Sequence, residues 1–464
     1  MIRNLISFVA VIFLLSCSPS QVADQAPASS EATQAAVDNT PDWLKTANLY
    51  EVNIRQYTPE GTFSAFEAHL PRLQEMGVKI LWLMPISPIS ETKRKGTLGS
   101  YYAVSDFREI NAEFGDESSF RSLVEKTHEL DMKIILDWVP HHTGWDHTWI
   151  KEHPEYYSKD EEGNIVDPIN EETGEPWDWT DVAELDLENP EMRKEMTADM
   201  KYWIEAYEID GYRVDHAHRV PLDYWQEIIP EIKSLGRELF LLAEGEDPWL
   251  RNRAGFDATY SWHFHHTLND IAQGRKNANA IDYLLWNDRN AYAHGFHIYF
   301  TSNHDENSWA GTVMERMGDG HQTFAVLCHT IDGMPLIYSG QEEPLRKRLE
   351  FFEKDPIEWK NYAYADFYWI LQNEKVRNEA LWNGEFGGPP VRINRSKEVY
   401  AFKREKNGDK LVVIINLTGE TQITTLDEAV SSMVDIFHSQ EVEIGAGADI
   451  QLDPWEYLVL SNMD

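Results

Sequence analysis

Carboxylates and histidines gather at four points of the chain, each time at the end of a short apolar run. Asp137, Asp215 and Glu244 end three of these runs, and Asn303-His304-Asp305 ends a fourth. Two carboxyl groups held about 5 Å apart can cleave a glycosidic bond with retention of configuration, because one attacks the anomeric carbon while the other protonates the departing oxygen. A third acid can stabilise the charge that develops on the sugar, and an Arg beside the nucleophile keeps it ionised. Arg213 stands in that place.

These groups need a scaffold that brings distant parts of the chain together. β-branched and aromatic runs alternate with amphipathic helical stretches, and eight such runs are the number that a closed (β/α)8 barrel requires. The carboxyl ends of all barrel strands meet at one mouth, where active sites form. We therefore expect an α/β protein built on a (β/α)8 TIM barrel. The expected strands are residues 47–57, 78–85, 133–139, 211–217, 239–245, 256–260, 296–303 and 334–341. Residues 66–76, 120–130, 191–207 and 224–234 are expected to be helical.

Breaks in this alternation predict the domain boundaries. The barrel is expected over residues 41–380, with a small inserted subdomain at 143–185, after the third strand, where a polar segment is too long for a simple loop. Residues 381–464 show short alternating runs with Gly, Asn and Asp turns, which predict a C-terminal antiparallel β domain. The aromatic segments 145–149 and 177–179 of the insertion are candidates either for substrate contacts or for the core of the small subdomain.

Composition limits the partners of this chain. A formal net charge of −38 argues against nucleic acid and against anionic membrane surfaces, since both would be repelled. A neutral substrate would not be. The chain also has 17 Trp, 20 Tyr and 19 Phe, enough aromatic rings for some of them to stack on sugars. The oligomeric state is not predicted.

The first residues read as an export signal. Met1-Ile2-Arg3-Asn4 precedes an apolar run over residues 5–15, and Leu14-Leu15-Ser16-Cys17 resembles the bacterial lipoprotein box. That resemblance implies a signal peptide over residues 1–16 and lipidation of Cys17; an ordinary secretory signal is the alternative. Residues 17–40, rich in Ala, Ser, Gln and Pro, are typical of a flexible tether. We expect a periplasmic or outer-membrane lipoprotein of the cell envelope that meets the membrane through its lipid anchor only.

Four motifs resemble those of glycoside hydrolase family 13, the α-amylase family, and they occur in the family's order. They are Asp137-Trp-Val-Pro-His-His142, Gly211-Tyr-Arg-Val-Asp-His-Ala217, Ala243-Glu-Gly245 and Phe300-Thr-Ser-Asn-His-Asp305. The resemblance implies retaining hydrolysis of the α-1,4-glucosidic bonds of starch, glycogen or maltooligosaccharides. Asp215 would be the nucleophile, Glu244 the acid/base and Asp305 the acid that stabilises the transition state. The residues implied to contact the sugar whose bond is cut are Tyr102, Asp137, His142, Arg213 and His304.

Departures from the family pattern concern the surroundings of these groups. His141 stands where the family commonly has an Asn that often ligates a structural calcium, and His is a poor ligand for a cation that prefers oxygen. No cofactor is expected to be required, and a calcium at this place is disfavoured. His218 and Arg219 replace Lys and His, which fits a shifted preference for chain length or acceptor. Residues 183–186 replace the usual fifth motif, so the subfamily is left open.

The sequence leaves several related activities open and makes two others remote alternatives. A cyclomaltodextrinase, an α-glucosidase and an α-glucan transglycosylase would use the same three acids. A metal-dependent amidohydrolase would use the histidines at 141–142, 216–218 or 263–266, but the His pair of that family lies on the first strand. A non-catalytic glycan-binding lipoprotein is disfavoured by the intact three acids.

Overall fold

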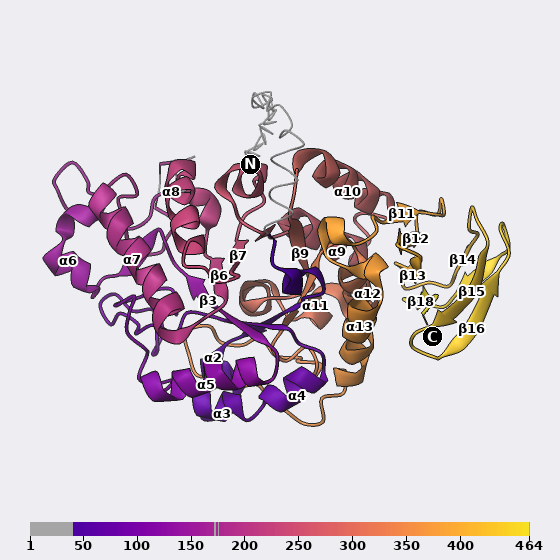
Figure 1. Cartoon of the computed structure of the whole chain (residues 1–464), viewed down its shortest axis with the longest axis horizontal. Helices are drawn as coiled ribbons and strands as arrows, with labels where there is room; N and C mark the ends of the chain where they lie inside the picture. The colour runs from indigo at the N-terminus through magenta and orange to yellow at the C-terminus, as the bar shows by residue number, and fades with distance from the viewer. Residues whose placement is uncertain (1–39, 171–172, 175, 464) are drawn as a thin grey trace, which may run out of the picture.

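The computed structural model describes residues 40–170, 173–174 and 176–463. The predicted signal peptide and Cys17, like almost all of the tether, lie outside this part of the chain. Eight parallel strands close into a barrel in the order β1-β10-β9-β8-β7-β6-β3-β2, with helices packed around it (Figure 1). The predicted TIM barrel is therefore confirmed. Its strands are β1 (Leu49–Val52), β2 (Ile80–Leu83), β3 (Lys133–Trp138), β6 (Gly211–Val214), β7 (Phe240–Ala243), β8 (Ala258–Thr259), β9 (Phe296–Phe300) and β10 (Met334–Tyr338).

Side-chain caps start two of the longer helices. Asp116 forms a capping box at the start of α5, and Asn189 accepts from two backbone amides ahead of Pro190 in α7. The helix expected over 66–76 is instead two helices, because Pro71 has no amide hydrogen and suits only the first turn of a new helix. The helices are α2 (Ile54–Tyr57), α3 (Phe63–Glu67), α4 (Leu70–Glu75), α5 (Glu117–Glu129), α7 (Pro190–Tyr207), α8 (Leu222–Lys233), α9 (Trp262–Ala272), α10 (Asn279–Ala291), α11 (Val313–Met317), α12 (His321–Thr330) and α13 (Ala365–Arg377).

An insertion separates β3 from α7. It opens with β4 (His142–Gly144), which pairs antiparallel with β5 (Val182–Glu184), so that His142 lies opposite Glu184. Between these strands lie α6 (Thr148–Glu152) and a 3-10 turn (Pro154–Tyr156). The insertion therefore starts and ends in a two-stranded ribbon beside the barrel mouth.

The C-terminal part is an antiparallel β structure, as predicted, and lies at the right of Figure 1. A six-stranded sheet has the order β11-β12-β13-β18-β15-β16, and β14 pairs with β17. These strands enclose a hydrophobic cluster of their own, which includes Val412, Ile414 and Leu460. The strands are β11 (Val391–Arg392), β12 (Val399–Lys406), β13 (Asp409–Asn416), β14 (Gln422–Thr424), β15 (Val430–Asp435), β16 (Gln440–Ile444), β17 (Ile450–Leu452) and β18 (Tyr457–Ser461).

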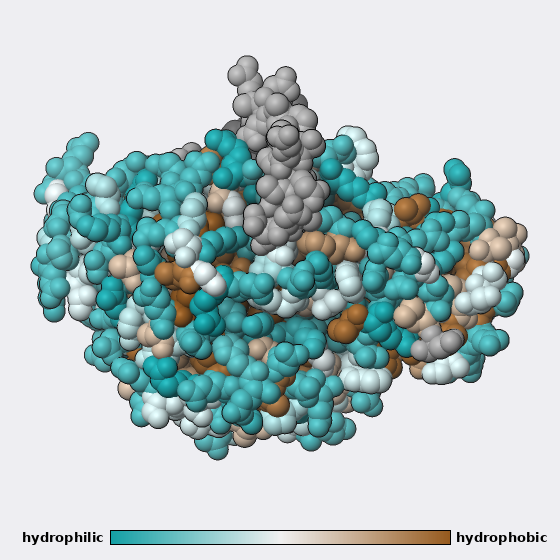
Figure 2. Space-filling model, in the orientation of Figure 1, coloured by the Kyte–Doolittle hydropathy of each residue, from teal (hydrophilic) through white to brown (hydrophobic). Residues whose placement is uncertain are grey.

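The face shown in Figure 2 is mostly hydrophilic, with apolar residues scattered across it. Within the described residues, no helix is both long and apolar enough to cross a bilayer.

Candidate active site

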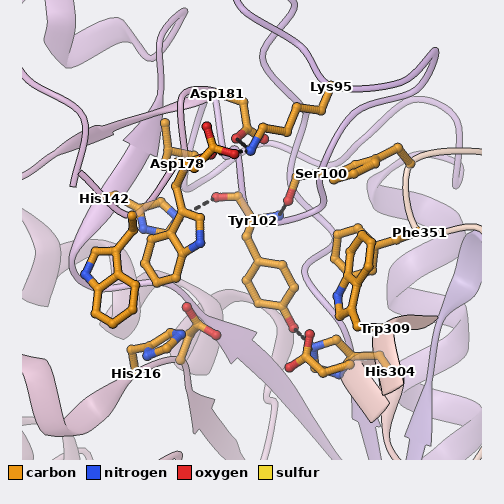
Figure 3. A pocket seen from close by; sticks show the side chains of 16 residues that line it. Lys95, Ser100, Tyr102, His142, Asp178, Asp181, His216, His304, Trp309 and Phe351 are labelled. Carbon is orange, nitrogen blue, oxygen red and sulfur yellow. Dashed lines mark hydrogen bonds and ion pairs between the residues drawn. The ribbon is translucent and has the colours of Figure 1, made fainter. Parts of the chain in front are cut away.

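A cleft of about 550 Å³ opens at the carboxyl ends of the barrel strands. Five of the eight predicted site residues line it, and the other three, Asp137, Arg213 and Glu244, are buried and joined to Asp215 through Arg213. Figure 3 shows the Tyr102 hydroxyl directed at His304 and the His142 ring on the opposite side of Tyr102. The five lining residues are Tyr102, His142, Asp215, His304 and Asp305.

Arg213 on β6 joins the acids of the site. Its Nη1 lies 2.7 Å from Asp215 Oδ1 and 3.0 Å from Asp137 Oδ1, and its Nη2 lies 3.0 Å from Glu244 Oε2. The guanidinium is fully buried under the ring of Trp82 on β2, 5.0 Å from the ring centroid. A cation held so close to three carboxylates offsets much of the repulsion among them.

Asp137 at the end of β3 is fixed from two further sides. The Trp82 indole Nε1 and the Tyr102 hydroxyl each donate a hydrogen bond of 3.1 Å to its Oδ2. Burial raises the pKa of Asp137 to about 7, although Arg213 acts to lower it. The side chain therefore both orients Tyr102 and takes part in the charge balance of the site.

Asp215 and Glu244 face each other from neighbouring strand ends. A carboxylate oxygen of each lies within 4.8 Å of the other, close to the separation of about 5 Å typical of retaining enzymes. Burial raises the pKa of Asp215, while burial of Glu244 is outweighed by Arg213 and His216, which lower its pKa to about 2. Repulsion between the two acids is thus outweighed at Glu244 in the free site, because Arg213 pairs with both groups.

Glu51 is a site residue that the sequence motifs did not indicate. It lies on β1, is fully buried, and accepts a 2.5 Å hydrogen bond from Nδ1 of His304. Burial alone would lower the pKa of His304, but Asp305 and Glu51 raise it to about 9. His304 is therefore a cation, and its Nε2 donates to the Tyr102 hydroxyl at 2.9 Å. The available signal was an acid in the otherwise uncharged strand Leu-Tyr-Glu-Val.

The surroundings of His141 do not fit calcium. Its Nε2 lies 3.0 Å from His142 Nδ1, and since His142 Nε2 is 3.1 Å from the Tyr102 carbonyl, His141 is the donor in the first contact. Nδ1 of His141 is buried without a hydrogen-bond partner. The charged or basic groups that act on it are His142, His216, His218 and Arg219, whereas calcium requires about six or more oxygen ligands.

Aromatic side chains wall the cleft on two sides. Trp177 and Trp179 of the insertion stack on each other with centroids 5.5 Å apart, and both line the cleft. Trp309 and Phe351 stand together on another wall (Figure 3). Trp145 instead packs under Lys93 and donates to the Thr180 carbonyl. Of the two aromatic segments noted in the sequence, 177–179 therefore meets the cleft and 145–149 belongs to the packing of the insertion.

The histidines that suggested an amidohydrolase fall into two groups, because those at 141–142 and 216–218 lie together beside the cleft and those at 263–266 lie elsewhere. His265 is buried on α9 against Glu306, and His263 pairs with Glu246, outside the cleft. His141 and His142 pair with each other instead. Among the described residues, the group whose atoms could share an ion is Asp215, His216 and Glu244.

Comparison with known proteins accounts for this arrangement. Residues 28–388 match the model of the α-amylase catalytic domain, and residues 399–459 match that of the α-amylase SusG C-terminal domain. Similar sequences include α-amylase 3 of Dictyoglomus thermophilum (23% identity, 81% of this chain, 85% of the relative) and a cyclomaltodextrinase of Thermoanaerobacter pseudethanolicus (25%, 80% and 66%). A noncanonic maltogenic α-amylase of Thermotoga neapolitana has a similar structure, with a TM-score of 0.80 at 28% identity over 90% of this chain and 99% of that one. The chain therefore belongs to the α-amylase family of glycoside hydrolases.

Proposed function

We propose that this protein hydrolyses α-1,4-glucosidic bonds of starch, glycogen or maltooligosaccharides by double displacement. The observation that carries the proposal is the pair Asp215 and Glu244, whose carboxylates lie within 4.8 Å of each other and share Arg213. That spacing leaves room for direct attack by a carboxylate but not for an intervening water, which inverting enzymes place between groups about 6.5–9.5 Å apart.

In the first step, an Asp215 oxygen attacks the anomeric carbon while Glu244 protonates the glycosidic oxygen of the leaving sugar. In the second step, Glu244 takes a proton from water, which displaces Asp215 and releases a product with the original configuration. Asp305 faces the cleft beside cationic His304 and stabilises the positive charge on the sugar ring. The free site holds Glu244 ionised. When substrate fills the cleft it expels water, which raises the energetic cost of the charge on Glu244, so that Glu244 takes up its proton.

The walls of the cleft support an oligosaccharide substrate. Trp177 with Trp179 on one side and Trp309 with Phe351 on another provide stacking surfaces for sugar rings. Chromatography of early products from amylose, cyclodextrin and maltotriose separates endo cleavage from the alternatives. A preference for cyclodextrin would indicate a cyclomaltodextrinase, and products longer than the substrate would indicate a transglycosylase.

Replacement of the two acids tests the mechanism. Asp215→Asn and Glu244→Gln should each lower kcat on maltooligosaccharides by several orders of magnitude with the fold intact, because each removes a step with no substitute. Circular dichroism provides the folding control, and NMR of the first product should show the α anomer. Near-native rates in either variant, or a β-anomeric first product, would show that the assignment of roles is wrong.

We also propose that a lipid on Cys17 holds the enzyme at the cell envelope. The apolar run over residues 5–15 and the following Leu14-Leu15-Ser16-Cys17 support this proposal. Cys17→Ala should move the protein from the membrane fraction to the soluble fraction of cells that express the full chain. An unchanged partition would rule the anchor out.

A further inference from the structure

Three side chains at the base of the cleft place metal-binding atoms near one another. Asp215 and His216 follow β6 and Glu244 follows β7, and one ligand atom from each lies within 4.8 Å of the other two. The two carboxylates are buried, and His216 is half-buried and lines the cleft (Figure 3). A tetrahedral ion with bonds of about 2.0–2.1 Å needs donors about 3.4 Å apart, which small side-chain rotations would provide.

His216 is held in an unusual backbone conformation at this point. Its φ of 43° and ψ of 41° lie in the left-handed region, which is unfavourable for a residue with a side chain. Its backbone N–H donates to Glu244 Oε2 at 2.8 Å, so one of the proposed ligands fixes the position of another. Its Nδ1 is buried and has no hydrogen-bond partner. The main chain is therefore fixed, while a ring nitrogen is left unused.

The charge around the cleft favours an added cation. Five carboxyl groups surround two cationic side chains at the base of the cleft, although burial raises the pKa of Glu51, Asp137 and Asp215. Higher up, Asp178 and Asp181 line the cleft together with Lys95, so acids outnumber cations there as well. Arg213 has two opposing effects on an incoming ion. Its positive charge repels the ion, but its ion pairs hold Asp215 and Glu244, the two carboxylates that would bind the ion, in place. The acids at the base are Glu51, Asp137, Asp215, Glu244 and Asp305, and the cations are Arg213 and His304.

We propose that Asp215, His216 and Glu244 form a binding site for a first-row divalent transition-metal ion such as Zn²⁺, with the open fourth position facing the cleft. One imidazole and two carboxylates suit Zn²⁺, whereas Ca²⁺ and Mg²⁺ prefer more ligands, all of them oxygen. A bound ion occupies the lone pairs of Asp215 and Glu244, so neither can act on a sugar. The ion is thus a reversible inhibitor that competes with substrate. The inhibition, though not the binding, rests on the proposed function.

Direct binding tests the site without reference to activity. Titration of the metal-free full chain with Co²⁺ should give the visible absorption of a four-coordinate ion, saturating at one ion per chain, and Zn²⁺ should displace it. His216→Ala should weaken Zn²⁺ binding, measured by calorimetry, by about tenfold or more because it removes a ligand. His218→Ala is the matched control, since that ring lies only 5.5 Å from His216 but is not one of the three ligands.

Equal Zn²⁺ affinity in His216→Ala and the wild type, an equal loss in His218→Ala, or displacement of Co²⁺ by equimolar Ca²⁺ would each overturn the site. In wild-type assays on maltooligosaccharides, Zn²⁺ should raise the apparent KM and a chelator should restore it. If Co²⁺ binds as described but the wild type cleaves no α-glucan, the metal site stands and the proposed function falls. Inhibition that persists in full in His216→Ala would show that Zn²⁺ acts elsewhere.

Discussion

Glu51 and His304 lie 253 positions apart in the chain and influence each other's charge at the barrel mouth. His304 presents Nδ1 to Glu51 and Nε2 to Tyr102. In the cation both nitrogens carry hydrogen, so each can donate to its partner and the ring has no second tautomer. The two partners do not affect each other's pKa equally. Glu51 helps to raise the pKa of His304, whereas burial raises the pKa of Glu51 even though His304 acts to lower it. The pair is therefore ionic above the raised pKa of Glu51 and below the pKa of His304, about 9.

Glu51→Gln should shift the alkaline limb of the pH profile of kcat/KM to lower pH. Glutamine removes one of the two groups that raise the pKa of His304, so the cation is lost at lower pH than in the wild type. The same linkage makes the stability from cationic His304 complete below its unfolded pKa of about 6.5 and lost as pH rises through about 9. Rates on a maltooligosaccharide between pH 5 and pH 10 measure the shift.

Glu342→Gln is the matched control, because Glu342 is also fully buried but binds Tyr50 and Arg72 away from the cleft. We expect that variant to lose stability and to keep the wild-type pH profile. The same shift in both variants would mean that Glu51 acts only through the general stability of the barrel.

The difference between Asp215 and Glu51 shows what the sequence alone could predict. Asp215, Glu244 and Asp305 lie in contiguous motifs at strand ends, where the barrel topology itself predicts that they meet. Glu51 pairs with a residue 253 positions away, and only the closed barrel places β1 beside the loop that follows β9. Trp309 and Phe351 were missed for another reason, since the five-residue π-helix that holds Trp309 and the turn that holds Phe351 are too short for periodicity to show which side faces a cleft.

At the scale of elements, Arg219 ties the insertion to the barrel. It lies in the turn after β6, donates from Nη2 to the Ile169 carbonyl at 2.8 Å, and sits 5.7 and 5.6 Å from the rings of Trp177 and Trp179. Its Nη2 is also 3.8 Å from Glu184 on β5. A guanidinium can stack and donate at once, which an ammonium cannot do.

Trp179→Ala should raise KM for maltooligosaccharides several-fold with a smaller effect on kcat. One aromatic stacking contact contributes about 0.5–1.5 kcal/mol, which corresponds to a factor of about 2 to 13. Steady-state kinetics on chains of increasing length measure the effect. Trp369→Ala on α13, where the ring is exposed outside the cleft, should leave KM unchanged. An unchanged KM for Trp179→Ala would show that this wall does not bind the chain.

Removal of calcium should leave the melting temperature unchanged, because the groups around His141 are basic and do not fit calcium. Arg219→Ala should lower it, because the contacts between the insertion and the barrel are lost. Differential scanning calorimetry with a chelator, with and without added Ca²⁺, provides the measurement. A large drop with the chelator that Ca²⁺ alone reverses would contradict the assignment.

At the scale of the whole molecule, Arg404 joins the β domain to the barrel. The side chain is fully buried and donates to the carbonyls of Gly388, Ile331 and Trp382 at 2.6, 2.8 and 2.9 Å. Ile331 follows α12 of the barrel, whereas Arg404 itself lies on β12. A mutation of this residue acts on both domains at once.

Arg404→Ala should lower the free energy of unfolding by about 3 kcal/mol or more, because each buried carbonyl left without a donor costs about 1–3 kcal/mol. Urea unfolding followed by circular dichroism measures the change. Arg395→Ala removes an exposed guanidinium of the same domain and should change stability by less than about 0.5 kcal/mol. Equal effects of the two substitutions would show that the domains are not joined through Arg404.

The ribbon of β4 and β5 has a mechanical consequence. His142 belongs both to this ribbon and to the cleft, and it is paired with Glu184, at the far end of the segment that carries Trp177 and Trp179. A displacement of the insertion relative to the barrel would therefore also move His142 away from the Tyr102 carbonyl. If the proposed function holds, such a displacement would couple the loss of contacts with a glucan to the loss of the reacting geometry.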